Sequence, residues 1–376
     1  MDANRPLVIA LCMWGLAVVI VSVLVIIDPV NHTVTGSLHQ ATGDWWARQD
    51  IYVGHKGMNY LPQAVIVFTP FHFIPDRATA DILWRLAGVV PLVLGLVLLA
   101  RSLDKTNWQL PFLWMTLIGL WTCLGSVRNA QPNMHFSAMQ VLAAAMLLRR
   151  RWWLAAVCLV VATAIKPLGV VMMGLAPFLY PALWMPLIVG NLVLLGLPFL
   201  VGPPDYVISQ YLLLAENFKD TATVTDHRFA DISGFVRTFG GELPSAVSLV
   251  LRPLAGALTL GLWIVAGRRN SEPFRALLLL SLASAYLMLF NPMTEANSYI
   301  ILAPAMAAMS VYLSDFDGRR RLGTVIAVMT LSLGLLPEPL RHVWPKFSLW
   351  WFPTMAALFG VLVVYRAFQS PFDRTE

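Results

Sequence analysis

The sequence of 376 residues predicts an all-α protein that crosses a membrane many times. Hydrophobic residues make up 58% of the chain and charged residues only 12%, against about 25% charged residues in soluble domains. The mean hydropathy of +0.69 agrees with this class. The apolar runs are continuous and do not alternate with polar residues, which excludes an outer-membrane barrel.

Twelve apolar runs predict twelve membrane spans. The first run exceeds the core of a signal peptide, and no small-residue cleavage site follows it, so we expect it to be retained as a span. A thirteenth run, residues 61–74, is short and contains Pro62 and Pro70. We expect it to form a re-entrant or interfacial helix. The twelve spans are 7–27, 80–100, 109–127, 134–148, 152–165, 167–182, 184–201, 247–267, 274–290, 298–313, 322–337 and 348–365.

Basic residues predict how these spans are oriented. If the N-terminus is cytoplasmic and residues 61–74 do not cross, 14 of the 26 Lys and Arg residues fall in short cytoplasmic connections or tails, as the positive-inside rule expects. If 61–74 crossed, the basic clusters 149–151 and 319–321 would move outside. The sequence therefore predicts cytoplasmic termini and a re-entrant first-loop helix.

The predicted outer face carries nearly all of the mixed polar chemistry. It receives two long loops, residues 28–79 and 202–246, and four short connections. The second loop mixes aromatic and polar residues, and we expect short helices there. One membrane domain, residues 1–376, with a functional site at its outer surface is the natural interpretation.

Four charged residues near this face are candidates for chemistry. Asp28 follows the first span, where partial shielding from water would raise its pKa and suit a general base; the alternative is that it only marks the helix end. Arg128 and Lys166 are suited to a lipid phosphate, or else they snorkel towards water. Glu295 lies in a short connection and could act as a base, orient a sugar hydroxyl or form a structural ion pair.

The order of several short motifs resembles glycosyltransferase family 87, the polyprenol-phosphate-mannose-dependent mannosyltransferases of the GT-C type. The resemblance covers residues 28–170 well and continues loosely through residues 292–299. The segments that carry it are Asp50-Ile51-Tyr52, Tyr60-Leu61-Pro62-Gln63, Pro70 to Pro75, Leu83-Trp84-Arg85-Leu86, Asn129-Ala130-Gln131-Pro132-Asn133 and Ala164-Ile165-Lys166-Pro167.

The resemblance implies a GT-C fold and inverting transfer of a sugar at the outer face of a bacterial cytoplasmic membrane. The donor would be a polyprenyl-phosphate sugar, usually mannose, although arabinose or another pentose stays open; the acceptor would be a lipid or a glycan. Arg128 and Lys166 would hold the donor phosphate. The residues expected to contact sugar or acceptor are Gln131, Asn133, Tyr60, Asn297 and His32.

The resemblance also implies an aspartate base in the first loop, and here this sequence departs from the family. The family's aspartate lies about 17 residues before the tyrosine matched by Tyr52, which corresponds to Thr35 here. Asp28 is then the first candidate for the base and Glu295 the second, with Asp44 and Asp50 as further candidates.

Several function classes are excluded or kept as alternatives. The scattered charges and the lack of a phosphate-cradling glycine loop argue against nucleic-acid or nucleotide binding. All three cysteines fall in apolar runs and the histidines are scattered, so we expect no disulfide, metal site or cofactor. A lipid or solute transporter and a non-catalytic GT-C scaffold remain alternatives to the enzyme.

Overall fold

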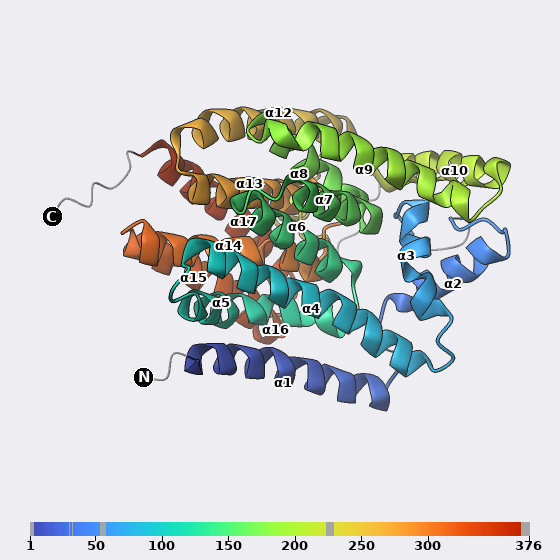
Figure 1. Cartoon of the computed structure of the whole chain (residues 1–376), viewed down its shortest axis with the longest axis horizontal. Helices are drawn as coiled ribbons and strands as arrows, with labels where there is room; N and C mark the ends of the chain where they lie inside the picture. Colours follow the sequence, from blue (N-terminus) through green and yellow to red (C-terminus); the bar gives the residue numbers. More distant parts are fainter. Residues whose placement is uncertain (1–3, 30, 32, 53–57, 223–228, 370–376) are drawn as a thin grey trace.

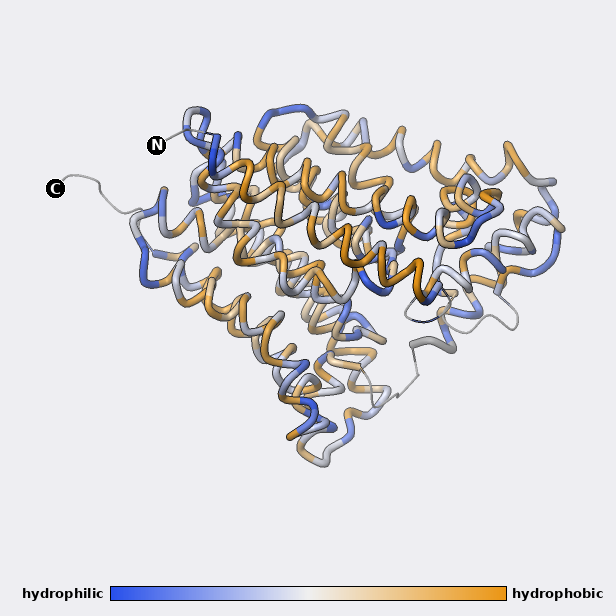
Figure 2. Tube along the Cα trace, turned by 90° about the horizontal axis from the view of Figure 1, so that it is seen from below, coloured by the Kyte–Doolittle hydropathy of each residue, from blue (hydrophilic) through white to orange (hydrophobic). Residues whose placement is uncertain are grey.

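The computed structural model describes residues 4–29, 31, 33–52, 58–222 and 229–369. In this part of the chain the secondary structure is helical, with no strand. Long apolar helices run roughly side by side along the longest axis of the molecule (Figure 1). Hydrophobic residues fill the middle of these helices, and hydrophilic residues gather at their ends (Figure 2). The predicted class, a multi-pass helical membrane protein, is confirmed.

Eight helices of the described residues are long and apolar enough to cross a membrane. The longest, α4, has 27 residues and is therefore about 40 Å long, against roughly 30 Å for a hydrocarbon core. The eight are α1 (Arg5–Ile27), α4 (Arg77–Leu103), α5 (Gln109–Arg128), Pro181–Leu200 with α9 (Trp184–Gly196), α12 (Ser245–Arg269), α13 (Glu272–Phe290), Ala296–Phe316 with α14 (Ala303–Val311), and α17 (Phe347–Phe368).

The other four predicted spans are also helical but shorter. They have 12 to 17 residues, or roughly 18 to 26 Å, which falls short of a full hydrocarbon core. The count of twelve crossings therefore stays a prediction. These helices are α6 (Pro132–Leu148), α7 (Trp152–Ile165), Pro167–Phe178 with α8 (Val170–Leu175), and α15 (Arg320–Leu335), which is followed by α16 (Pro337–Leu340).

Four further helices belong to the two long loops. In the first loop, α3 (Pro62–His72) coincides with the expected re-entrant segment, and its 11 residues span only about 16 Å. The preceding helix α2 (Thr35–Trp46) was not expected. The second loop forms α11 (Ile232–Thr238), a short helix as expected, and α10 (Pro204–Ala222), which at 19 residues is longer than expected.

The two ends of the bundle differ in the chain segments they hold. α2, α3 and α10 gather at one end, whereas α1 begins and α17 ends at the other (Figure 1). The predicted cytoplasmic connections meet at that second end: Arg150 pairs with Glu272 at 2.9 Å, and the buried Arg366 binds Asp317. The basic connections are thus brought together, as the charge pattern requires.

A separate hydrophobic cluster fixes the loop helices to the bundle. It joins α2, α3, α4 and α10, with Trp45, Phe68, Trp84 and Leu214 buried at its centre. The main core runs through the long helices from α1 to α17. The first loop is therefore a packed cap over one end of the bundle, and its inner surface is available to build a site.

Candidate active site

A cavity of about 630 Å³ lies beneath this cap. Its walls come from segments far apart in the sequence: the start of α2, the residues before α3, the start of α6, the α7–α8 connection, α10, α12 and α13 with the connection that follows it. A volume of this size is typical of a small-molecule site. Its polar and charged lining residues are Ser37, Asn59, Tyr60, Gln131, Asn133, Lys166, Arg252, Tyr286, Asn291, Glu295 and Ser298.

Lys166 reaches the cavity because the chain breaks at Pro167. The residue before a proline is driven out of the helical region, and Lys166 has extended backbone angles of φ −147° and ψ 127°. Its Nζ donates a hydrogen bond to Oδ1 of Asn133 at 2.5 Å. Burial lowers the pKa of Lys166 to about 8, although the negative charge of Glu295 opposes this shift. The ammonium group is thus held ready for an anionic ligand.

Two amide side chains connect this cation to a carboxylate. Nδ2 of Asn133 donates to Oε1 of Gln131 at 2.6 Å and to Oγ of Ser298 at 3.2 Å. Nε2 of Gln131 in turn donates to Oε2 of Glu295 at 3.1 Å. Each amide oxygen faces the cationic end, and each amide NH₂ group faces the anionic end. Lys166, Asn133, Gln131 and Glu295, here called the amide chain, therefore form one aligned hydrogen-bond network.

The turn between α5 and α6 places the two amides. Ala130 adopts a left-handed conformation with φ 52°, which reverses the chain after α5. Gln131 is then the extended N-cap residue of α6, and Pro132 begins the helix. Both Gln131 and Asn133 are buried, so their polar atoms need the partners that the amide chain supplies.

Glu295 comes from the connection after α13 and is the one carboxylate among the described residues that line the cavity. The residue is exposed. A hydrogen bond of 2.6 Å between the Ala230 amide and the Thr294 carbonyl anchors this connection. Burial, reinforced by the charge of Glu295, raises the pKa of Tyr60 to about 12. The phenol therefore stays protonated and can donate a hydrogen bond to a substrate.

Several polar lining residues, among them Asn59 and Arg252, are absent from the set that sequence reasoning predicted. Asn59 accepts a hydrogen bond of 2.9 Å from Asn217 of α10. Arg252 lies on α12 and is the second cation of the cavity. Its position inside the apolar run 247–267 is the signal that could have found it, because a cation there needs a partner or a use.

Part of the cavity lining is apolar. Leu287 and Phe290 of α13 contribute to it, together with Leu168 and Val171 from the segment after Lys166. Val170 also lines the cavity and is 52% exposed. The cavity therefore combines charged residues with apolar ones.

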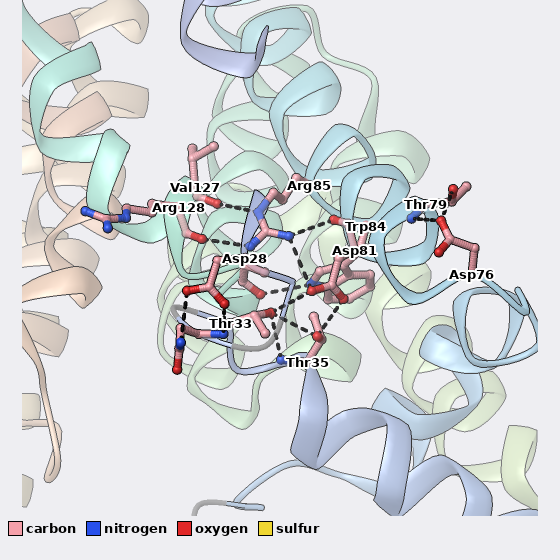
Figure 3. Close-up of polar contacts among 12 residues, drawn as sticks. Asp28, Thr33, Thr35, Asp76, Thr79, Asp81, Trp84, Arg85, Val127 and Arg128 are labelled. Carbon is pink, nitrogen blue, oxygen red and sulfur yellow. Dashed lines mark hydrogen bonds and ion pairs between the residues drawn. The ribbon is translucent and has the colours of Figure 1, made fainter. Parts of the chain in front are cut away.

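The remaining predicted acidic residues do not line the cavity. Asp28 accepts hydrogen bonds from the backbone and side-chain nitrogens of Asn31, at 3.2 and 2.9 Å, and its carboxylate is seen there in Figure 3. Asp50 accepts a hydrogen bond of 2.8 Å from the Tyr52 amide. Asp44 lies on α2, also away from the cavity lining.

Two other predicted residues are likewise not brought to the cavity, and a third cannot be placed. The side chain of Arg128 is exposed and points away from the first loop (Figure 3). The Asn297 side chain lies against Gly125 of α5. His32 falls outside the described residues. Of the predicted set, the structure brings together Glu295, Lys166, Gln131, Asn133 and Tyr60.

Within the described ranges, no group of three or more His, Cys, Asp or Glu side chains is placed to hold a metal ion. The chemistry that the lining residues offer is anion binding by two cations, proton acceptance by one carboxylate, and hydrogen bonding by amides and a phenol.

Comparison with known proteins identifies the family. No curated protein matches this sequence significantly. The model of glycosyltransferase family 87 matches residues 59–292, more than half of the chain. This range contains most of the cavity lining, including Lys166, Gln131, Asn133 and Arg252. The chain therefore belongs to glycosyltransferase family 87.

Proposed function

We propose that this membrane glycosyltransferase moves a sugar from a polyprenyl phosphate to a lipid or glycan acceptor in the cavity. Mannose is the first candidate for the sugar. Both the sugar and the acceptor class are taken from the resemblance to glycosyltransferase family 87. The observation that carries the proposal is a single cavity lined both by the cations Lys166 and Arg252 and by apolar residues such as Leu287 and Phe290. This arrangement suits a ligand with an anionic head and a hydrocarbon tail.

In this proposal the donor enters sideways from the bilayer. Its prenyl chain contacts Leu168, Leu287 and Phe290, and its phosphate binds Lys166 and Arg252. Cations beside the phosphate stabilise the negative charge that grows as the sugar leaves. The sequence alone suggested Lys166 and Arg128 for this role. Arg252 takes the place of Arg128 here, because Arg128 is not part of the cavity lining.

Glu295 is the base in this proposal. The acceptor hydroxyl gives its proton to the Glu295 carboxylate, its oxygen bonds to the anomeric carbon, and the bond from that carbon to the phosphate oxygen breaks. The electron pair of that bond leaves with the polyprenyl phosphate, and attack from the opposite face inverts the anomeric centre. Glu295 is preferred to Asp28 because it lines the cavity, whereas Asp28 binds Asn31 elsewhere.

We further propose that the cavity faces the outer side of a bacterial cytoplasmic membrane and that both termini are cytoplasmic. The grouping of the basic connections at the end opposite the cap supports this orientation through the positive-inside rule. The partners are then the lipid-linked donor, the acceptor and the surrounding lipids, with no nucleic acid and no cofactor.

The test is a transfer assay with the purified protein in nanodiscs, synthetic polyprenyl-phosphate mannose and a crude glycolipid extract. Mass spectrometry of the lipids should reveal a product heavier by one hexose. If no product forms while donor binding is retained, the non-catalytic scaffold is the better description. If neither transfer nor binding occurs with mannose or pentose donors, the proposal fails and the transporter becomes the leading alternative.

A further inference from the structure

A buried pair of opposite charges lies behind the cavity wall on α4. Asp81 is 1% exposed and Arg85 is 3% exposed, and Nη1 of Arg85 lies 3.6 Å from Oδ2 of Asp81. Neither residue lines the cavity, and the proposed reaction does not use them. Burying two charges is costly unless hydrogen bonds satisfy both groups, so their partners indicate what the pair does.

The Asp81 carboxylate holds the start of the first loop. Oγ1 of Thr35 donates to Oδ1 at 2.6 Å, and Oγ1 of Thr33 donates to Oδ2 at 2.9 Å. Between them, the Val34 amide donates to the Asn129 carbonyl at 3.1 Å. The side chain of Val34 lines the cavity. One wall of the cavity is thus tied to the carboxylate of Asp81 and to the α5–α6 turn.

The Arg85 guanidinium holds that turn from the other side. Its Nε donates to the Val127 carbonyl at 3.0 Å, and its Nη2 donates to the Arg128 carbonyl at 2.7 Å. The last carbonyls of a helix lack partners within the helix, and here one side chain satisfies two of them. Figure 3 shows Asp81 and Arg85 between the two threonines on one side and the end of α5 on the other.

We propose that Asp81 and Arg85 are positioning residues for sugar transfer. They clamp the first loop to the α5–α6 turn and so fix the place of Gln131, three residues after Arg128. Gln131 reaches Glu295 through a single hydrogen bond of 3.1 Å, which a displacement of a few tenths of an ångström would break. This inference rests on the proposed function, because its catalytic effect passes through Glu295.

The clamp makes a prediction that separates positioning from donor binding. Lys166 belongs to the α7–α8 connection and makes no direct contact with the clamp; it reaches Gln131 only through Asn133. Loosening the clamp should therefore lower kcat much more than it weakens donor binding. A general loss of structure would lower both together.

The experiment compares Thr35→Val, Thr33→Val and Arg85→Lys in nanodiscs, each with kcat, the donor Kd and the thermal midpoint measured. We expect kcat to fall at least tenfold in Thr35→Val and Arg85→Lys, with the donor Kd within twofold of wild type. Thr35→Ser, which keeps the hydroxyl, should restore kcat to within twofold. Thr33→Val is the milder variant should Thr35→Val fail to fold.

Thr79→Val is the matched control. Its hydroxyl also donates to a carboxylate, that of Asp76, but at the exposed start of α4 and away from the clamp (Figure 3). Its kcat should stay within twofold of wild type. If kcat of Thr79→Val fell as much as that of Thr35→Val, the loss of either threonine hydroxyl would impair the enzyme regardless of the clamp. The proposal would then be overturned.

Hydrogen–deuterium exchange of the same variants gives a readout that does not depend on activity. Exchange at Val34 and in residues 127–131 should become faster in Thr35→Val and stay unchanged in Thr79→Val. Unchanged exchange, an unchanged kcat, or a parallel loss of kcat and donor affinity would each overturn the proposal. If wild type itself transfers no sugar, the proposed function fails and the catalytic role with it, whereas the exchange data still decide whether the clamp exists.

Discussion

The charge of Lys166 should make donor binding depend on pH in a defined way. Because burial lowers the pKa of Lys166 to about 8, the ammonium form is present below that pH and is lost above it. With a pKa of about 8, the charged fraction falls from about 90% at pH 7 to about 10% at pH 9. The phosphodiester of the donor keeps one negative charge throughout, so its affinity should fall about five- to ninefold over this range.

The size of the Lys166 contribution can be tested by substitution. A hydrogen bond to a charged group contributes about 1.5 to 3 kcal/mol, so Lys166→Met should weaken donor binding about 10- to 150-fold at pH 7 and remove most of the pH dependence. Lys166→Arg keeps its charge at pH 9 and should bind the donor equally well at both pH values. Lys105→Met, at the opposite end of the bundle, should resemble wild type.

The measurement is isothermal titration calorimetry of nanodisc-embedded protein with polyprenyl-phosphate mannose at pH 7, 8 and 9. A wild-type Kd that is constant over this range, or the same decline in Lys166→Arg as in wild type, would refute the role assigned to Lys166. A decline that appears also in Lys166→Met would assign the pH dependence to another group.

Four further predictions test the cavity and the topology. Glu295→Gln should lower kcat by about 10²- to 10⁴-fold with an unchanged donor Kd, whereas Asp28→Asn should stay within threefold of wild type; the reverse pattern would move the base to Asp28. Arg252→Ala should weaken donor binding about tenfold or more, and Arg128→Ala should not; equal effects would contradict the cavity assignment. Transfer should persist in EDTA, because the described part of the cavity lining offers one carboxylate and no histidine; loss of activity that Mg²⁺ or Mn²⁺ restores would establish a metal requirement. A tag at the C-terminus should be protected from protease in intact spheroplasts, and cleavage there would reverse the orientation.

Hydropathy and charge alone determined the class of the protein and most of its helices. A span is recognised from its own residues, because every backbone group in a bilayer must be satisfied within the helix. The short helix at 62–72 was predictable for a similar reason, since its length and its prolines are local properties. The helix α2 escaped prediction because its packing against α3, α4 and α10, and not its own weakly apolar sequence, buries it.

Part of the site was also visible in the sequence. Lys166, Gln131, Asn133 and Glu295 each lie next to a span at the predicted outer end, where a polar residue is costly unless it is paired or used. Their places next to the predicted spans follow from the chain alone. That they form one hydrogen-bond network depends on contacts between residues as far as 164 positions apart, which no local pattern contains.

Only the tertiary structure distinguished between residues that were equally good candidates on the sequence alone. Asp28 and Glu295 both flank spans and both carry a carboxylate, yet only Glu295 lines the cavity. Arg128 and Arg252 both lie near the outer end, yet the helix direction turns Arg128 outward and Arg252 inward. Side-chain direction depends on how each helix is rotated against its neighbours, and that rotation is set by packing across the whole bundle.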